Sequence, residues 1–212
     1  LPRFIQGGGT VFSSMMAIGA TGNPGLARDV SSVIAREARA IGIHWSFGPT
    51  ADVNSNPENP IINTRSFGED PDTVARFVEA SVRGLQEEHV LATLKHFPGH
   101  GDTSEDTHRT LPTLLHDRER LDSVELVPFR RGLAVGARSV MTGHLALPAV
   151  DATGRPGSLS YQIVTGLLRR ELGFDGLVVT DAMTMQGISD TYPPEEAAVL
   201  AMEAGVDMIL VP

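Results

Sequence analysis

Stretches with the spacing of an amphipathic helix alternate along the chain with short, almost wholly apolar runs. The first such stretch, ARDVSSVIAREARAIG, places Val30, Val33, Ile34 and Ala38 on one face and leads into the run IHWSFGP. Four further stretches each lead into an apolar run: DTVARFVEASVRGLQEEH into VLATLKHF, RERLDSVELVPFRRGLAVGA into RSVMTGHLALP, YQIVTGLLRRELGFDG into LVVTDAM, and PEEAAVLAMEAG into VDMILVP. The pattern predicts five successive helix–strand pairs.

Glycines and the character of the apolar runs indicate how these pairs are arranged. Gly42, Gly136, Gly173 and Gly205 stand where four of the helices should end, at the position that commonly adopts the left-handed conformation. The runs show no alternation of polar and apolar residues, which is typical of strands buried on both faces in a parallel sheet. An α/β fold follows, and both a doubly wound sheet and a (β/α)8 barrel fit the alternation.

Polar side chains follow the apolar runs and favour the barrel. Asp52, Lys95 with His96, His144 and Asp181 each stand where a predicted strand ends. In a (β/α)8 barrel, catalytic residues collect at the carboxyl ends of the strands. Because the five predicted strands cannot close an eight-stranded barrel, we expect about three strands to lie outside this chain. The predicted fold is an incomplete TIM-type barrel that lacks early strands and the last strand.

Composition and charge restrict the possible partners. Residues 1–212 contain 41% hydrophobic and 20% charged residues, which is ordinary for one globular domain. The net charge of −9 argues against nucleic acid, because phosphate binding requires a basic surface. No apolar run approaches the ~20 residues of a membrane span. The chain has no cysteine, which excludes thiolate metal ligands but leaves the compartment open.

The stretch KHFPGHGDTSEDTH, residues 95–108, has the highest density of titratable groups. It holds three histidines, three acidic residues and one lysine among glycine and proline breakers. A metal site, a catalytic loop and a polar surface turn all fit this composition. Asp106 and His108 project to the same side of an extended loop, so the carboxylate could hold one ring nitrogen while the other faces a substrate. We expect Gly99 and Gly101 to allow this loop to move.

Long motifs in a fixed order resemble the catalytic domain of family 3 glycoside hydrolases. They are ATGNPGLARDVSSVIAREARAIGIHWSFGPTADVNSNPENPIINTRSFGEDP, then LKHFPGHGDTSEDTH, VMTGH and ELGFDGLVVTDAMTMQGI. Within the family, the chain is most similar to bacterial β-N-acetylglucosaminidases that recycle peptidoglycan. The resemblance implies a (β/α)8 barrel. It also implies that the chain begins after the family's Asp-x-Glu-Gly-Gly strand end and stops before the last strand.

The resemblance assigns a role to each candidate residue, and each also has a structural alternative. It implies that Asp181 is the nucleophile, that Asp106 and His108 form the acid/base dyad, and that no metal or cofactor takes part. It implies that the sugar is bound by Arg65, Lys95, His96 and His144. Taken alone, Asp181 could cap a helix, the Lys95–His96 pair could be structural, and His144 could belong to the core. Asp52 could orient the binding loop.

The predicted function is that of a retaining exo-β-N-acetylglucosaminidase acting on cell-wall muropeptide-type glycosides. A β-glucosidase and a glycoside phosphorylase are alternatives within the family. A metal-dependent barrel hydrolase is a further alternative, with His96, His144 and Asp181 as zinc ligands. A sugar-binding module without catalysis is the last one, and the retention of both proposed catalytic residues argues against it.

Overall fold

The computed structural model describes residues 8–104 and 110–211, and its centre is a parallel sheet of four strands. The strands are β1 (Thr93–Phe97), β2 (Ser139–Thr142), β3 (Leu177–Ala182) and β4 (Met208–Leu210), and they lie side by side in chain order. Sequential parallel pairing with a helical crossover between neighbours is the winding of a (β/α)8 barrel. The α/β prediction is therefore confirmed.

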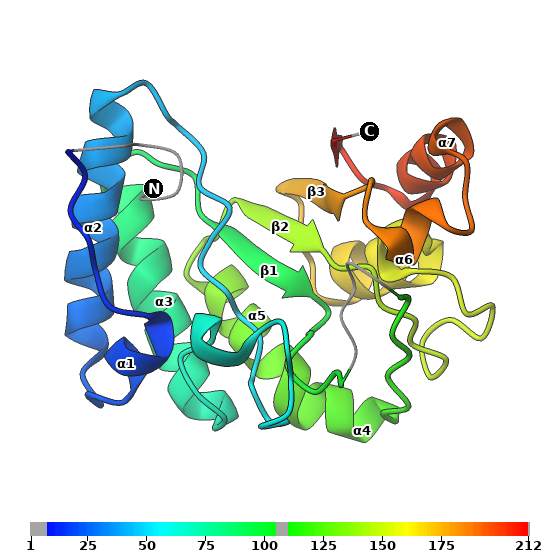
Figure 1. The fold of residues 1–212 in the computed structure, drawn as a ribbon, viewed down its shortest axis with the longest axis horizontal. Helices are drawn as coiled ribbons and strands as arrows, with labels where there is room; N and C mark the ends of the chain where they lie inside the picture. Colours follow the sequence, from blue (N-terminus) through cyan, green and yellow to red (C-terminus); the bar gives the residue numbers. More distant parts are fainter. Residues whose placement is uncertain (1–7, 105–109, 212) are drawn as a thin grey trace.

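The helices follow the strands in an arc from α2 to α7 (Figure 1). The five predicted helical stretches correspond to α2 (Pro24–Ala40), α3 (Pro71–Glu87), α4 with η2 and α5, η4 (Gln162–Glu171, a π-helix) and α7 (Pro194–Ala204). The shorter elements are α1 (Met15–Gly19), η1 (Asn63–Arg65), α4 (Arg118–Arg120), η2 (Leu121–Glu125), α5 (Leu126–Ala134), η3 (Gly157–Leu159) and α6 (Gln186–Ser189). The four glycines expected at helix ends all have positive φ, between 69° and 105°.

The first predicted strand, residues 43–49, is not a regular strand. The segment lies parallel to β1 but forms only two isolated bridges, Trp45 with Leu91 and Thr50 with Lys95. Five residues of the segment thus span the distance of four residues in its neighbour, which is a bulge. Gly48 and Pro49 lie at the bulge, and Pro49 has no N–H to donate to a ladder. The chain that follows this segment nevertheless places Asp52 beside the end of β1.

The core lies between the sheet and the helices that cover its outer side. Helix α3 packs on α2 and α5, and it buries Val74, Phe77, Val78 and Val82 on one face. Asp70 caps this helix by accepting the amide hydrogen of Thr73. Each fully buried aromatic or branched side chain stabilises the fold by about 1.5–3 kcal/mol.

Within residues 8–104 and 110–211, no helix has the length and apolar character needed to cross a membrane.

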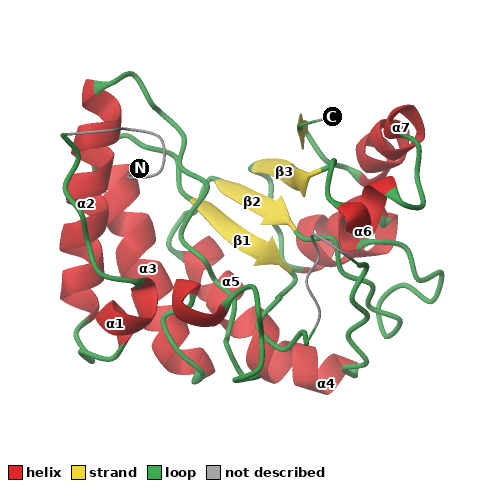
Figure 2. Ribbon diagram, viewed as in Figure 1, coloured by secondary structure: helices red, strands yellow, loops and turns green. Residues whose placement is uncertain are grey.

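The loops gather where the strands end (Figure 2). The carboxyl ends of β1, β2 and β3 lie at one edge of the sheet, because the three strands are parallel and in register near Ser139, Val140 and Thr142. The structure is thus an incomplete TIM-type barrel wall. Its carboxyl edge is where the sequence placed the candidate site.

Candidate active site

Three of the strand-end side chains meet at the carboxyl edge of the sheet. His96, near the end of β1, places Nδ1 2.7 Å from Asp52 Oδ2 and Nε2 3.9 Å from Asp181 Oδ2. His96 and Asp52 are buried, whereas the Asp181 side chain is 23% exposed. The arrangement is a buried Asp–His pair beside an accessible carboxylate.

Asp52 is the anchor of this arrangement because it accepts three hydrogen bonds. The backbone amides of His96 and His100 donate to Oδ1 over 3.0 and 2.8 Å, and the His96 ring donates to Oδ2. Burial raises the pKa of Asp52 to about 6, although the nearby His100 and the two amide donors act to lower it. At neutral pH the carboxylate form therefore predominates, and it ties the end of β1 to the loop that follows.

The ring of His96 is neutral and has a defined tautomer. Burial and the neighbouring Lys95 lower the pKa of His96 well below its ordinary value. Because a carboxylate can only accept, the ring carries its proton on Nδ1, toward Asp52. Nε2 is then an acceptor, and Arg65 Nη2 donates to it over 3.3 Å. The sequence-predicted binding residues Arg65, Lys95 and His96 thus lie together.

Asp181 lies in β3, one residue before the strand ends, and remains ionised. Burial acts to raise its pKa, but His96, the amide of Ala182, His144 and Lys95 together lower it below the ordinary value. That amide donates to Asp181 Oδ1 over 2.8 Å. Burial lowers the pKa of Lys95, and Asp181 acts in the opposite direction. A partly exposed carboxylate held ionised beside neutral and cationic groups is suited to nucleophilic attack.

His144 is held by protein groups at both ring nitrogens. Nε2 donates to the backbone carbonyl of Ala182 over 3.0 Å, which leaves Nδ1 to accept from the Ser158 hydroxyl over 2.8 Å. The ring therefore connects the end of β2 to the residue after Asp181. Its predicted contact with a sugar stays a prediction, and its use as a zinc ligand loses support because its lone pair is engaged. Among the residues that the structure describes, no cluster of His, Asp and Glu could hold a metal ion.

The first turn of the candidate catalytic loop is packed tightly. A methyl group on Gly101 would lie 1.7 Å from the carbonyl oxygen of Val53, and one on Gly99 would lie 2.8 Å from Cβ of Glu125. Both glycines are buried. The glycines are required here because the backbone approaches other groups closely, and the expected movement of the loop stays a prediction.

Sequence reasoning missed the groups that fix His100. Asn59 Nδ2 donates to the His100 carbonyl over 2.8 Å and to the Thr103 hydroxyl over 3.2 Å. The His100 ring lies 2.7 Å from that hydroxyl, and burial lowers its pKa to about 4. The only signal in the sequence was the density of Asn and Pro around residue 59, which marks a loop but no contact.

Asp106 and His108, the predicted acid/base dyad, lie outside the described residues. The space beside the described groups is compatible with substrate. A cavity of about 350 Å³ lies next to Arg65 and Lys95 and is also lined by Ser13, Ser14, Phe47 and Thr64. Hydroxyl, guanidinium and ammonium groups around an open hollow can hydrogen-bond the hydroxyls of a sugar.

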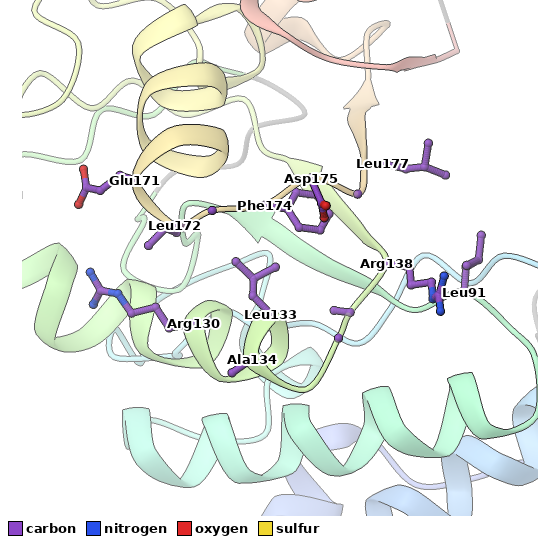
Figure 3. A pocket seen from close by; sticks show the side chains of 14 residues that line it. Leu91, Arg130, Leu133, Ala134, Arg138, Glu171, Leu172, Phe174, Asp175 and Leu177 are labelled. Carbon is purple, nitrogen blue, oxygen red and sulfur yellow. The ribbon is translucent and has the colours of Figure 1, made fainter.

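A larger cavity, of about 900 Å³, lies at the opposite end of the sheet (Figure 3). It is lined by Leu91, Arg138 and Leu177 at or just before the amino ends of β1, β2 and β3, and by Phe174 and Glu171. In (β/α)8 barrels this end contributes to stability, whereas catalysis takes place at the carboxyl end. We therefore place the candidate active site at Asp181.

Comparisons with known proteins agree with this fold. The chain is 43% identical to "Beta-hexosaminidase A" of Pseudoalteromonas piscicida over 96% of the chain and 36% of that protein. It is 40% identical to "Beta-N-acetylglucosaminidase/beta-glucosidase" of Cellulomonas fimi, over 95% of the chain and 37% of that protein. A family 3 β-N-acetylglucosaminidase structure from Paenibacillus sp. str. FPU-7 superposes with a TM-score of 0.96, at 50% identity, over 98% of this chain and 39% of that one.

The chain spans little more than a third of the length of these relatives. Residues 3–212 match the family described as "Glycosyl hydrolase family 3 N terminal domain". The long motifs and the incomplete barrel are both accounted for by this match. The chain belongs to the glycosyl hydrolase family 3 N-terminal domain family.

Proposed function

We propose that the chain carries the active site of a retaining exo-β-N-acetylglucosaminidase. The observation that supports this most directly is Asp181, an ionised and partly exposed carboxylate at a strand end, 3.9 Å from a buried neutral histidine. The names of two relatives, a β-hexosaminidase and a β-N-acetylglucosaminidase, support the choice of sugar. We further propose cell-wall muropeptide-type glycosides as the natural substrates.

Asp181 acts as the nucleophile in a double displacement. Its carboxylate oxygen attacks the anomeric carbon while the bond from that carbon to the aglycone oxygen breaks, and His108 donates a proton to the departing oxygen. The product is a glycosyl ester on Asp181. In the second step His108 accepts a proton from water, the water oxygen attacks the anomeric carbon, and the ester bond breaks. The sugar leaves with retained configuration.

The remaining residues bind the sugar or position those that do. Arg65 and Lys95 line the same hollow and offer hydrogen bonds to sugar hydroxyls, and His96 lies beside them, in hydrogen-bond contact with Arg65. His144 lies behind the end of β3, where it holds the carbonyl of Ala182, and we retain it as a residue at the margin of the binding site. Asp106 orients the imidazole of His108 by accepting from its second nitrogen.

Covalent trapping tests the nucleophile. A 5-fluoro N-acetylglucosaminyl fluoride should inactivate the enzyme at its natural full length, and the labelled peptide should contain Asp181. Asp181→Ala should not be labelled and should keep less than about a hundredth of the wild-type kcat, because the covalent route is lost. Far-UV circular dichroism should be unchanged, because the side chain is partly exposed. A label on another residue, or substantial turnover by Asp181→Ala, would overturn the assignment.

A β-glucosidase is the second candidate, favoured by the double name of the Cellulomonas fimi relative. The two functions differ only in whether the enzyme requires the acetamido group at C2. Comparison of kcat/KM on the nitrophenyl glycosides of N-acetylglucosamine and of glucose separates them. A clear preference for glucose would replace the sugar in the proposal while leaving Asp181 as the nucleophile.

A further inference from the structure

A second group of charged side chains lies beneath the loop that follows β1, outside the site described above. Asp102 belongs to the start of this loop, His116 to its end, and Arg120 and Glu125 to the helical segment formed by α4 and η2. None of these residues touches the Asp52–His96 pair or Asp181 in the contacts of the described residues. We refer to Asp102, His116, Arg120 and Glu125 as the loop clasp.

The contacts of the loop clasp join two points that are fourteen residues apart in the chain, 102 and 116. His116 Nε2 lies 2.9 Å from Asp102 Oδ2 and 3.8 Å from Glu125 Oε1. Arg120 Nε donates to Glu125 Oε1 over 3.2 Å, and its Nη2 donates to the hydroxyl of Ser55 over 3.1 Å. Arg120 Nη2 is also 3.7 Å from Asp102 Oδ2. The loop clasp therefore joins residue 102 to residue 116.

Glu125 is the member of the loop clasp that lies in the protein interior. Its side chain is 2% exposed and packs against Gly99, in the first turn of the loop. Burial raises the pKa of Glu125, whereas Arg120 and then His116 act to lower it. Within the described part of the chain, Glu125 Oε2 and His116 Nε2 have no well-formed hydrogen bond. Buried polar atoms without hydrogen bonds are costly, which makes a role beyond packing worth testing.

We propose that Glu125 and His116 are positioning residues which hold both ends of the loop and so fix the place from which its acid/base residue acts. This proposal rests on the proposed function, in which His108 belongs to the same loop. The end of the loop is also held at Leu114, whose amide donates to the carbonyl of Ala146. The loop clasp, in contrast, attaches the two ends of the loop to each other.

Substrates with different leaving groups distinguish a positioning role of the loop clasp from an effect on protein stability alone. Proton donation matters for a poor leaving group such as a sugar, and little for a dinitrophenolate, which leaves without a proton. Asp102→Asn, His116→Gln and Glu125→Gln should lower kcat/KM on a chitobiose-type disaccharide by about 10- to 100-fold, the effect of a small misplacement of a catalytic group. The same variants should retain most of their kcat/KM on the dinitrophenyl glycoside, whereas kcat and KM on it should fall together, because the attack of water in the second step still requires the base.

Two comparisons complete the experiment, which uses the enzyme at its natural full length. His108→Ala should show the same selectivity more strongly, and azide should restore its turnover by replacing the base-activated water. Glu87→Gln, which removes an exposed ion pair with Arg28 between α2 and α3, should change neither substrate. Asp102→Asn combined with His116→Gln should be no worse than either alone, because the two side chains act as a unit.

The outcomes distinguish the two proposals. If His108→Ala is selective but the clasp variants slow both substrates equally, or not at all, the clasp proposal is overturned and the proposed function stands. If His108→Ala itself slows both substrates equally and azide restores neither, the acid/base assignment is overturned, and the role of the clasp in proton transfer is overturned with it. Glu125→Gln preserves the packing against Gly99, so a selective loss in that variant supports positioning directly.

Discussion

At the scale of single residues, the candidate site depends on one buried carboxylate. Asp52 accepts two backbone amides and one imidazole N–H, so three donors converge on two oxygen atoms. An isolated buried carboxylate would be strongly destabilised, and the donors offset that cost. In return, Asp52 holds the ring of His96 in the tautomer that leaves Nε2 facing Arg65 and the nucleophile.

Asp52→Asn should therefore impair the site although it changes few atoms. One oxygen becomes an NH2 group, which cannot accept from an N–H donor and must face one of the three. Hydrogen bonds to charged groups contribute about 1.5–3 kcal/mol, so kcat/KM should fall by about 10- to 100-fold. The matched control is Asp207→Asn, since Asp207 also accepts a backbone amide and an arginine but lies at the amino end of β3. Equal kinetic losses in both variants would contradict the specific role of Asp52.

At the scale of elements, regular periodicity and end signals were readable from the sequence, whereas close packing was not. Helix α3 could be predicted from its apolar face and its Asp70–Pro71 start, and the left-handed Gly173 from its place after a periodic stretch. The segment at residues 43–49 has the apolar character of a strand, but the bulge at Gly48–Pro49 interrupts its ladder. The reason for Gly101 lies in Val53, a residue about fifty positions away that no local pattern connects to it.

Gly101→Ala tests the packing of the loop. A methyl group 1.7 Å from the Val53 carbonyl oxygen cannot be accommodated without a backbone shift, so unfolding should become easier by about 1–3 kcal/mol. Gly166→Ala is the control, because Gly166 lies inside η4 and its nearest neighbour would be 3.4 Å away. That variant should stabilise the protein by about 0.5–1 kcal/mol. Urea unfolding of both variants measures the difference, and a neutral Gly101→Ala would show that the loop yields easily.

At the scale of the whole molecule, the sequence was sufficient to locate the site but not to describe its support. Parallel strands place their carboxyl ends at one edge, so charged residues that follow separate apolar runs, such as Asp52 and Asp181, had to meet. The resemblance supplied their roles. The contacts of Asn59, Ser158 and Glu125 depend on how loops from different crossovers pack together, and no periodic or end signal encodes that.

Buried titratable groups determine how the free energy of unfolding depends on pH. A histidine with a lowered pKa binds its proton in the unfolded chain but not in the folded one, so stability rises with pH up to the ordinary value of 6.5. His100, with a pKa of about 4, and His96, lowered by burial, both act in this direction. A carboxyl with a raised pKa binds its proton in the folded chain instead, so stability falls as pH rises. Asp52, raised from 3.8 to about 6, and Glu125 act in this opposite direction.

The histidine contribution should prevail between about pH 4.5 and 6.5, because the shift of His100 offsets that of Asp52, and the pKa of His96, lowered well below its ordinary value, offsets the raised pKa of Glu125. We therefore expect the free energy of unfolding in urea to increase across this range. Asp52→Asn removes the main opposing contribution and should make the increase steeper, even though the variant is less stable overall. His100→Asn removes a supporting contribution and should make it shallower. A stability that still decreases from about pH 4.5 to 6.5 when Asp52→Asn and Glu125→Gln remove the opposing carboxyls would mean that the imidazoles are charged in the folded protein. His96 could then no longer accept from Arg65, and the neutral Asp52–His96 pair on which the site is built would be wrong.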